Sequence, residues 1–148
     1  VEVHEQGGCQ AGAAPEDYQG QPGLTRSEIV EEFGDWELPD SIDEAGWWKC
    51  GRWERPDEAE ERARGAADLL MSRFGDSSAR VAVITHGMFK PILVSALLGR
   101  PFIGNEWLGD LYNTSVTQLE LSAGGVRLES YNDTSHLCDG GSDELLSA

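Results

Sequence analysis

The stretch Val81-Ala-Val-Ile-Thr-His-Gly-Met-Phe-Lys90 decides the fold. It opens with a short apolar run, which predicts a buried strand over about 81–85, and a polar turn follows. An apolar segment from about Phe89 to Leu98, closed by Gly99, then predicts a helix. A strand, a turn and a helix in this order form the repeating unit of an α/β protein. The predicted fold class is therefore α/β.

The turn of this unit carries His86, followed by Gly87. In open α/β sheets, the ends of strands usually build the functional site. The helix after the turn directs free N–H groups and a partial positive charge toward it, which suits an anion such as phosphate. A turn histidine can also be held there by hydrogen bonds alone, and a glycine can simply permit the turn. The position at a strand end favours His86 as a functional residue.

The composition is that of a folded protein with an acidic surface. The chain has 148 residues, 39% of them hydrophobic, and a net charge of −16. This charge argues against partners such as nucleic acid and anionic membranes, which require basic surfaces. No apolar run approaches the roughly 20 residues that span a membrane, and no signal peptide is visible. Three widely separated cysteines form neither a metal-ligand spacing nor a disulfide framework, so we expect a cytoplasmic location.

Shorter patterns predict the elements of the first third of the chain. Residues 1–8 alternate like a short strand that ends in a glycine turn, and residues 9–24 have the composition of a loop. Thr25-Arg-Ser-Glu28 is a capping box, and it predicts a helix whose apolar face carries Ile29, Val30 and Phe33. Residues 35–55 form a loop or short helical excursion. Tryptophans are expected to anchor it by packing.

The later elements follow from equally local signals. Pro56 is placed to begin a helix, and alanines at helical spacing from Ala59 onward give it one apolar face. The segments 115–121 and 126–131 predict a β-hairpin. From Asp139 the chain is rich in glycine, serine and acidic residues, which predicts a disordered tail.

Other polar residues offer weaker candidates for chemistry. Glu5, and alternatively Glu2, stands beside a glycine pair, where a carboxyl group can act as a general acid. The polar clusters 113–117 and 132–136 are interpreted as strand ends whose side chains bond the backbone. The chain has no Gly-x-Ser-x-Gly elbow, which argues against a serine-type α/β-hydrolase. It also has no Walker loop and no Gly-x-Gly-x-x-Gly motif, which argues against a nucleotide site.

Six pieces of the chain, taken in order and spacing, resemble the later part of the histidine phosphatase superfamily, the phosphoglycerate-mutase-like proteins. They are His4-Glu-Gln-Gly-Gly8, Gly23-Leu-Thr-Arg-Ser-Glu28, Gly46-Trp-Trp48, Val83-Ile-Thr-His-Gly87, Asn113-Thr-Ser-Val-Thr117 and Tyr131-Asn-Asp-Thr-Ser-His-Leu137. The resemblance implies a three-layer α/β/α fold and phosphoryl transfer through a phosphohistidine, with no metal and no cofactor.

The resemblance also implies residue roles. His86 matches the second histidine, which stabilises the transferring phosphoryl group, and Gly87 is its phosphate-binding neighbour. Glu5 best matches the glutamate that protonates the leaving oxygen, with Glu2 as the alternative register. The implied substrate is a phosphorylated small molecule or a phosphoprotein.

The chain departs from the family pattern in one important respect. The family's nucleophile lies in an Arg-His-Gly motif on the first strand, and this sequence has no such motif. We therefore expect residues 1–138 to be a partial domain that starts mid-domain, with an incomplete sheet and an inactive site, followed by a disordered tail over 139–148. An unpaired strand edge at 81–85 would favour homo-oligomers. The parent is expected to hydrolyse phosphomonoesters. The alternatives are a mutase and a non-catalytic interaction module that retains the fold.

Overall fold

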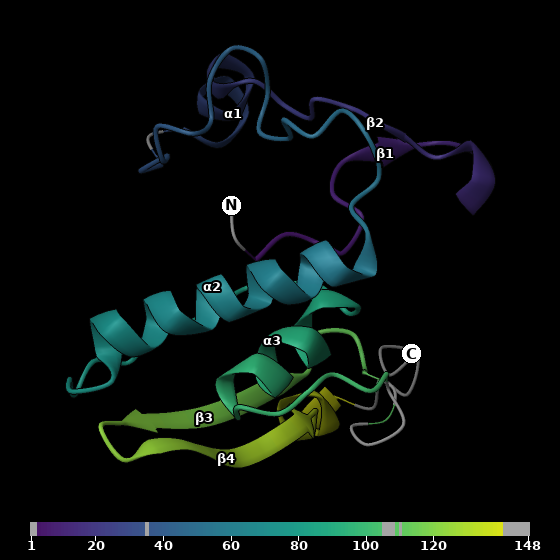
Figure 1. Cartoon of the computed structure of the whole chain (residues 1–148). Helices are drawn as coiled ribbons and strands as arrows, with labels where there is room; N and C mark the ends of the chain where they lie inside the picture. Colours follow the sequence, from purple (N-terminus) through teal and green to yellow (C-terminus); the bar gives the residue numbers. More distant parts are fainter. Residues whose placement is uncertain (1–2, 35, 105–108, 110, 141–148) are drawn as a thin grey trace.

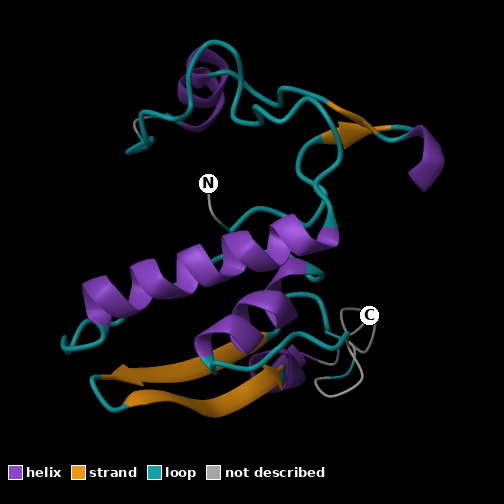
Figure 2. Cartoon of the chain, in the orientation of Figure 1, coloured by secondary structure: helices purple, strands orange, loops and turns teal. Residues whose placement is uncertain are grey.

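The computed structural model describes residues 3–34, 36–104, 109 and 111–140. Within these residues the chain forms three α-helices, two antiparallel strand pairs and two short 3-10 helices (Figures 1 and 2). In chain order they are β1 (Gln10–Ala11), η1 (Pro15–Asp17), β2 (Gln19–Gly20), α1 (Arg26–Phe33), α2 (Pro56–Phe74), α3 (Phe89–Leu97), β3 (Val116–Ser122), β4 (Gly125–Asp133) and η2 (Ser135–Gly140). The architecture is α/β, as the sequence predicts. No described helix is both long and apolar enough to cross a membrane.

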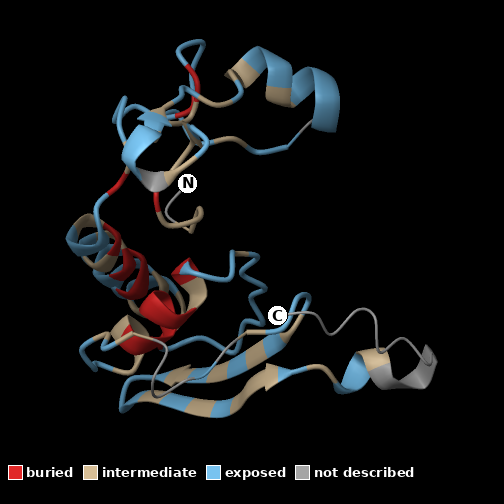
Figure 3. Ribbon diagram, turned by 90° about the vertical axis from the view of Figure 1, so that its right-hand side faces the viewer, coloured by how far each residue is buried: buried red, intermediate tan, exposed pale blue. Residues whose placement is uncertain are grey.

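Helices α2 and α3 pack against each other and form the core (Figures 1 and 3). Helix α2 begins at Pro56 and presents a stripe of buried alanines, as predicted. These small side chains let α3 approach closely with Phe89, Ile92 and Leu93. Phe89 is completely buried. The first residue of α3 is therefore clamped against α2, which holds the start of α3 in place.

Helix α1 begins at the predicted capping box. The Glu28 N–H donates to Thr25 Oγ1 (3.2 Å), and the Thr25 N–H donates to Glu28 Oε2 (2.8 Å). The predicted apolar face is not buried, however, since Val30 is 41% and Phe33 52% exposed. The helix is instead tied down by Arg26, whose guanidinium donates to backbone carbonyls of the following loop. Capping is local and was predictable, whereas the burial of a helix face depends on distant partners.

The hairpin predicted near the C-terminus is present as β3 and β4. The two strands pair in antiparallel register, with Ser122 opposite Gly125 at the turn. Burial alternates along β3, so one face of the hairpin is sheltered and the other faces solvent (Figure 3). On the solvent face, Arg127 forms ion pairs with Glu120 (2.6 Å) and Glu129 (2.8 Å).

The predicted strand at 81–85 is wrong for the described structure. This segment is not part of any strand pair among the described residues, and Val81 (48%), Val83 (40%) and Ile84 (88%) are exposed. A strand requires a neighbour that accepts and donates its backbone hydrogen bonds, and neither described sheet supplies one here. The apolar pattern was identified correctly, but the pairing partner cannot be inferred from local sequence.

The two ends of the chain also differ from expectation. Residues 3–8 form turns rather than a strand, with Gly7 and Gly8 at positive φ. The 3-10 helix η2 extends to Gly140, two residues into the segment predicted as tail. Residues 141–148, like Glu2, lie outside the described residues.

Candidate functional site

His86 ends the extended segment that leads into α3. Its carbonyl oxygen accepts a hydrogen bond from the Lys90 N–H (2.9 Å), the spacing of an α-helical bond. The side chain of His86 is exposed, and Gly87 beside it is exposed as well. An ideal Cβ at Gly87 would meet no atom within 4 Å. The imidazole is thus exposed just before the start of a helix, beside a position with open space.

Glu5 lies against the same helix start, although 84 positions separate it from Phe89. Its Oε1 accepts from the N–H groups of Phe89 (3.0 Å) and Gln6 (2.8 Å). Its Oε2 accepts a longer bond from the Met88 N–H (3.4 Å). The Met88 and Phe89 N–H groups lie at the start of α3, where no helical acceptor is available and the helix dipole favours an anion. The structure therefore brings Glu5 and the His86–Gly87 turn together.

This contact changes one expectation from the sequence. The free N–H groups at the start of α3 were predicted to face an external anion, but Glu5 occupies those of Met88 and Phe89. The anion preference of the helix start is real, and a carboxylate of the chain itself satisfies it. An external oxyanion at this turn would depend mainly on side chains.

A buried ion pair holds the turn that carries Glu5. The Arg62 guanidinium donates to both carboxylate oxygens of Glu54 (2.7 and 2.8 Å) and to the His4 carbonyl (3.2 Å). Glu54 Oε2 also accepts from the Gly7 N–H (3.3 Å). A second link joins the segments, because Thr85 Oγ1 donates to the Val3 carbonyl (2.6 Å). The 4–8 turn is therefore fixed to α2 on one side and to the His86 segment on the other.

Aromatic rings enclose His4 next to this ion pair. Its ring centroid lies 5.2 Å from the rings of Trp47 and Trp48 and 6.5 Å from that of Phe89. Burial lowers the pKa of His4 below its ordinary value. Trp47 and Trp48 are thus packing residues, as expected, whereas Trp36 is 68% exposed. Trp107 lies outside the described residues.

His86 lines a cavity of about 1210 Å³ between residues 77–87, α3 and β3, which we call the α3 groove. Gly87, Lys90 and Ser115 line it as well. Lys90 donates from Nζ to the carbonyl oxygen (3.0 Å) and Oγ (3.1 Å) of Ser115. Burial lowers the pKa of the Lys90 ammonium. The groove thus joins the imidazole, an ammonium and polar backbone in one space.

The two polar clusters near the C-terminus stabilise the hairpin ends, as interpreted from the sequence. Asn132 Oδ1 accepts from the Tyr112 N–H (2.9 Å), and Thr117 Oγ1 accepts from the Asn132 N–H (3.2 Å). Asp133 Oδ1 accepts from the Ser135 N–H (2.8 Å). These bonds satisfy backbone donors where the strand ladder ends.

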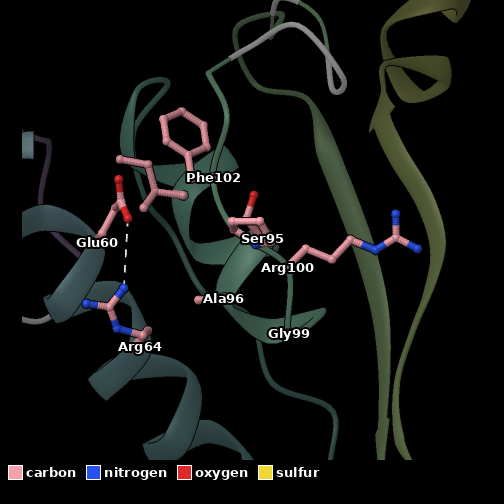
Figure 4. A pocket seen from close by; sticks show the side chains of 9 residues that line it. Glu60, Arg64, Ser95, Ala96, Gly99, Arg100 and Phe102 are labelled. Atoms are coloured by element: carbon pink, nitrogen blue, oxygen red, sulfur yellow. Dashed lines mark ion pairs between the residues drawn. The ribbon is translucent and has the colours of Figure 1, made fainter. Parts of the chain in front are cut away.

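A second cavity, of about 300 Å³, lies between α2 and the end of α3 (Figure 4). Glu60 and Arg64 line it and form an exposed ion pair of 3.8 Å. Neither Glu5 nor His86 lines this cavity. Among the described residues, no three His, Cys, Asp or Glu side chains gather in a way that would hold a metal ion.

Lys90, Glu54 and Arg62 are absent from the sequence-based site, although signals for two of them existed. Arg62 falls between Ala59 and Ala66 on the apolar face of α2, where an arginine needs a buried partner. Lys90 is one of only two lysines and is the one charged residue of the helix Phe89–Leu97. Glu54 precedes the helix and carries no comparable signal.

A comparison with family models supplies the wider context for this geometry. The model of the histidine phosphatase superfamily (branch 1) matches residues 16–134. The matched range contains His86, Gly87 and Lys90, whereas Glu5 precedes it. Neither the curated proteins nor the solved structures gave a significant match.

Proposed function

Since this chain belongs to the histidine phosphatase superfamily, whose chemistry is phosphoryl transfer, we propose that it is the part of a phosphomonoester hydrolase that stabilises the transferring phosphoryl group and protonates the leaving oxygen. The observation that carries the proposal is the meeting of Glu5 with the His86–Gly87 turn at the start of α3. His86 lines an open groove, and Glu5 bonds the helix start next to it. An acid and an imidazole are the groups that this chemistry requires.

In the proposed reaction, a histidine from outside this sequence attacks phosphorus in line with the leaving oxygen. His86 donates a hydrogen bond to a non-bridging phosphoryl oxygen, whose charge it stabilises in the transition state. Glu5 gives its proton to the leaving alkoxide, and the alcohol departs. Water then attacks the phosphohistidine while Glu5 takes back a proton, which releases phosphate and restores the enzyme.

Within this scheme, Oε2 is the oxygen of Glu5 that carries the proton. Oε1 accepts two short backbone bonds, of 2.8 and 3.0 Å. Oε2 accepts only the 3.4 Å bond from Met88. The less strongly bonded oxygen is free to exchange a proton with a substrate while the other anchors the side chain.

We further propose that residues 1–138 contribute to a three-layer α/β/α domain. The exposed apolar side chains of Val83 and Ile84 support this assignment, because the rest of the domain would cover them. A strand that carries the nucleophile would lie beside this segment and place its histidine near His86.

The test uses a protein in which an Arg-His-Gly strand accompanies this chain. Glu5→Gln should slow cleavage of an alkyl phosphate far more than cleavage of an activated aryl phosphate, because only the poor leaving group needs the proton. Glu61→Gln, an exposed residue on α2, is the matched control. His86→Ala should slow both substrates by about a hundredfold to a thousandfold.

Two results would overturn the assignment. If Glu5→Gln lowers the cleavage rate equally for both substrates, Glu5 is not the acid, and Glu2→Gln is the next variant to test. Robust turnover by the 148-residue chain alone, abolished by His86→Ala, would make His86 the nucleophile instead. Transfer of the phosphoryl group to a second acceptor rather than to water would identify a mutase.

A further inference from the structure

We propose that Lys90 is a substrate-binding residue that donates to the phosphoryl group at the inner end of the α3 groove, one helical turn from His86. The inference rests on the proposed function, because it places a phosphorylated substrate against His86. It adds a second cationic donor that neither the family match nor the sequence-based site assigns.

The spacing of the two residues supports this arrangement. His86 and Lys90 are joined by the α-helical bond from the Lys90 N–H to the His86 carbonyl (2.9 Å). Both side chains line the α3 groove. A phosphoryl group, with three equatorial oxygens, is large enough to contact both donors.

Within the part of the chain that the structure describes, Lys90 has no carboxylate counter-ion. An ammonium has three N–H donors, and the two oxygens of Ser115 accept from it. Among the described residues no carboxylate forms an ion pair with Lys90, whereas the other lysine, Lys49, pairs with Asp43. Lys90 is also half-buried. A partly desolvated cation that pairs with no carboxylate among the described residues is stabilised by an anion that enters the groove.

The charged residues that line the α3 groove also favour an anionic ligand. Its described lining holds three cationic side chains, Arg80, Lys90 and Arg127, and two carboxylates, Glu120 and Glu129. Arg127 pairs with both carboxylates, and three cations against two carboxylates leave the described lining with a net charge of +1. The chain as a whole carries a net charge of −16. A positive groove in so acidic a protein concentrates anionic ligands there.

The loop that holds Lys90 is itself constrained. Thr114 has a positive φ of 60°, which is unfavourable for a β-branched residue. Such a conformation persists only where the surroundings enforce it. Asn132 fixes one side of the loop through the Tyr112 N–H, and Lys90 fixes the other through Ser115. The ammonium is thereby held in position before a ligand arrives.

The test titrates the 148-residue chain with inorganic phosphate at constant ionic strength. Lysine labelled with ¹³C at Cε gives one resonance each for Lys90 and Lys49, and the His86 ring reports binding at the turn. We expect Lys90 and His86 to shift with one common Kd, while Lys49 stays unchanged. Lys90→Gln should weaken the Kd seen at His86 about tenfold, the loss of one charge-assisted hydrogen bond. Lys49→Gln should leave that Kd unchanged, and Lys90→Arg should retain most of the affinity.

The outcomes separate this inference from the proposed function. The proposed function stands, and Lys90 only anchors the Ser115 loop, in either of two cases. In the first, phosphate shifts the His86 resonance but not the Lys90 resonance. In the second, Lys90→Gln and Lys49→Gln give the same Kd at His86. If phosphate shifts neither residue, the oxyanion role of His86 fails and the Lys90 proposal fails with it. If Lys90→Gln does not fold, the resonance shifts of the wild-type chain and the phosphate affinity of Lys90→Arg still test whether Lys90 binds phosphate.

Discussion

Arg62→Met tests how the turn that carries Glu5 is held. Arg62 lies on the buried face of α2 and contacts Glu54, the 4–8 turn and Phe89. It bonds both oxygens of Glu54 and the His4 carbonyl, and its guanidinium carbon lies 3.8 Å from the Phe89 ring centroid. The side chains of Arg62 and Glu54 are only 11% and 6% exposed. Methionine keeps most of the apolar stem and removes the charge.

The expected loss of stability follows from the Glu54 carboxylate, which the substitution leaves buried without its partner. Without Arg62, Glu54 keeps only the Gly7 N–H (3.3 Å) as a hydrogen-bond donor among the contacts described above. Breaking a buried pair by removing one partner costs about 3–5 kcal/mol of unfolding free energy. Arg64→Met is the matched control on the same helix, because its pair with Glu60 is exposed and 3.8 Å long. It should cost about 0.3–0.5 kcal/mol.

Urea unfolding followed by tryptophan fluorescence and circular dichroism measures both variants. Hydrogen exchange at the Phe89 amide, which donates to Glu5, adds a local readout. We expect faster exchange there in Arg62→Met than in Arg64→Met. If Arg62→Met unfolds during purification, the double variant Glu54→Gln/Arg62→Met removes the unpaired charge and should recover part of the loss. A destabilisation of Arg62→Met equal to that of Arg64→Met would refute the reasoning.

Three further predictions concern packing, protonation and the exposed segment. Gly8→Ala places a Cβ 2.4 Å from the Trp48 ring at φ +73° and should cost about 3 kcal/mol or more. Gly34→Ala, at φ +77° with nothing within 4 Å, should cost about 1–2 kcal/mol. Urea unfolding measures both variants. Burial lowers the pKa of His4 in the folded protein below the 6.5 of the unfolded chain. Between these two pKa values the unfolded chain binds more protons than the folded protein. The stability present above pH 6.5 therefore declines as the pH falls from 6.5 toward the folded-state pKa. His4→Gln should flatten this decline in urea midpoints, and an unchanged slope would contradict it. Ile84, 88% exposed, should drive self-association, so Ile84→Lys should sediment as a smaller species at high concentration; identical sedimentation of both proteins would exclude this contact.

The elements that the sequence predicted correctly are those whose causes lie within a few residues. The capping box at Thr25 and Glu28 acts across three positions, and the alanine stripe of α2 follows from helical spacing alone. The hairpin likewise needs only two alternating segments and a short turn. Each of these patterns carries its own partner nearby, so it can be recognised without knowledge of the tertiary fold.

The features that the sequence did not predict depend on partners far away along the chain. The pairing of 81–85 depends on a neighbouring strand, and no local pattern says which segment provides it. The capping of α3 by Glu5 spans 84 positions and joins two segments that look unrelated in the sequence. The resemblance selected Glu5 and His86 as a pair, but only the folded chain shows that the acid occupies the helix start.

The position of Glu5 determines which hydrogen-bond donors of the proposed site remain for a phosphoryl group. The backbone N–H groups of Met88 and Phe89 bind the carboxylate, so they are not available to the phosphoryl group while Glu5 stays in place. The charge that develops on the phosphoryl oxygens must then be stabilised by side chains, of which His86 and Lys90 line the groove. In the proposed mechanism, backbone donors position the acid and cationic side chains hold the phosphoryl group. Because the two sets of donors are separate, Glu5→Gln should impair protonation of the leaving group without weakening phosphate binding at His86.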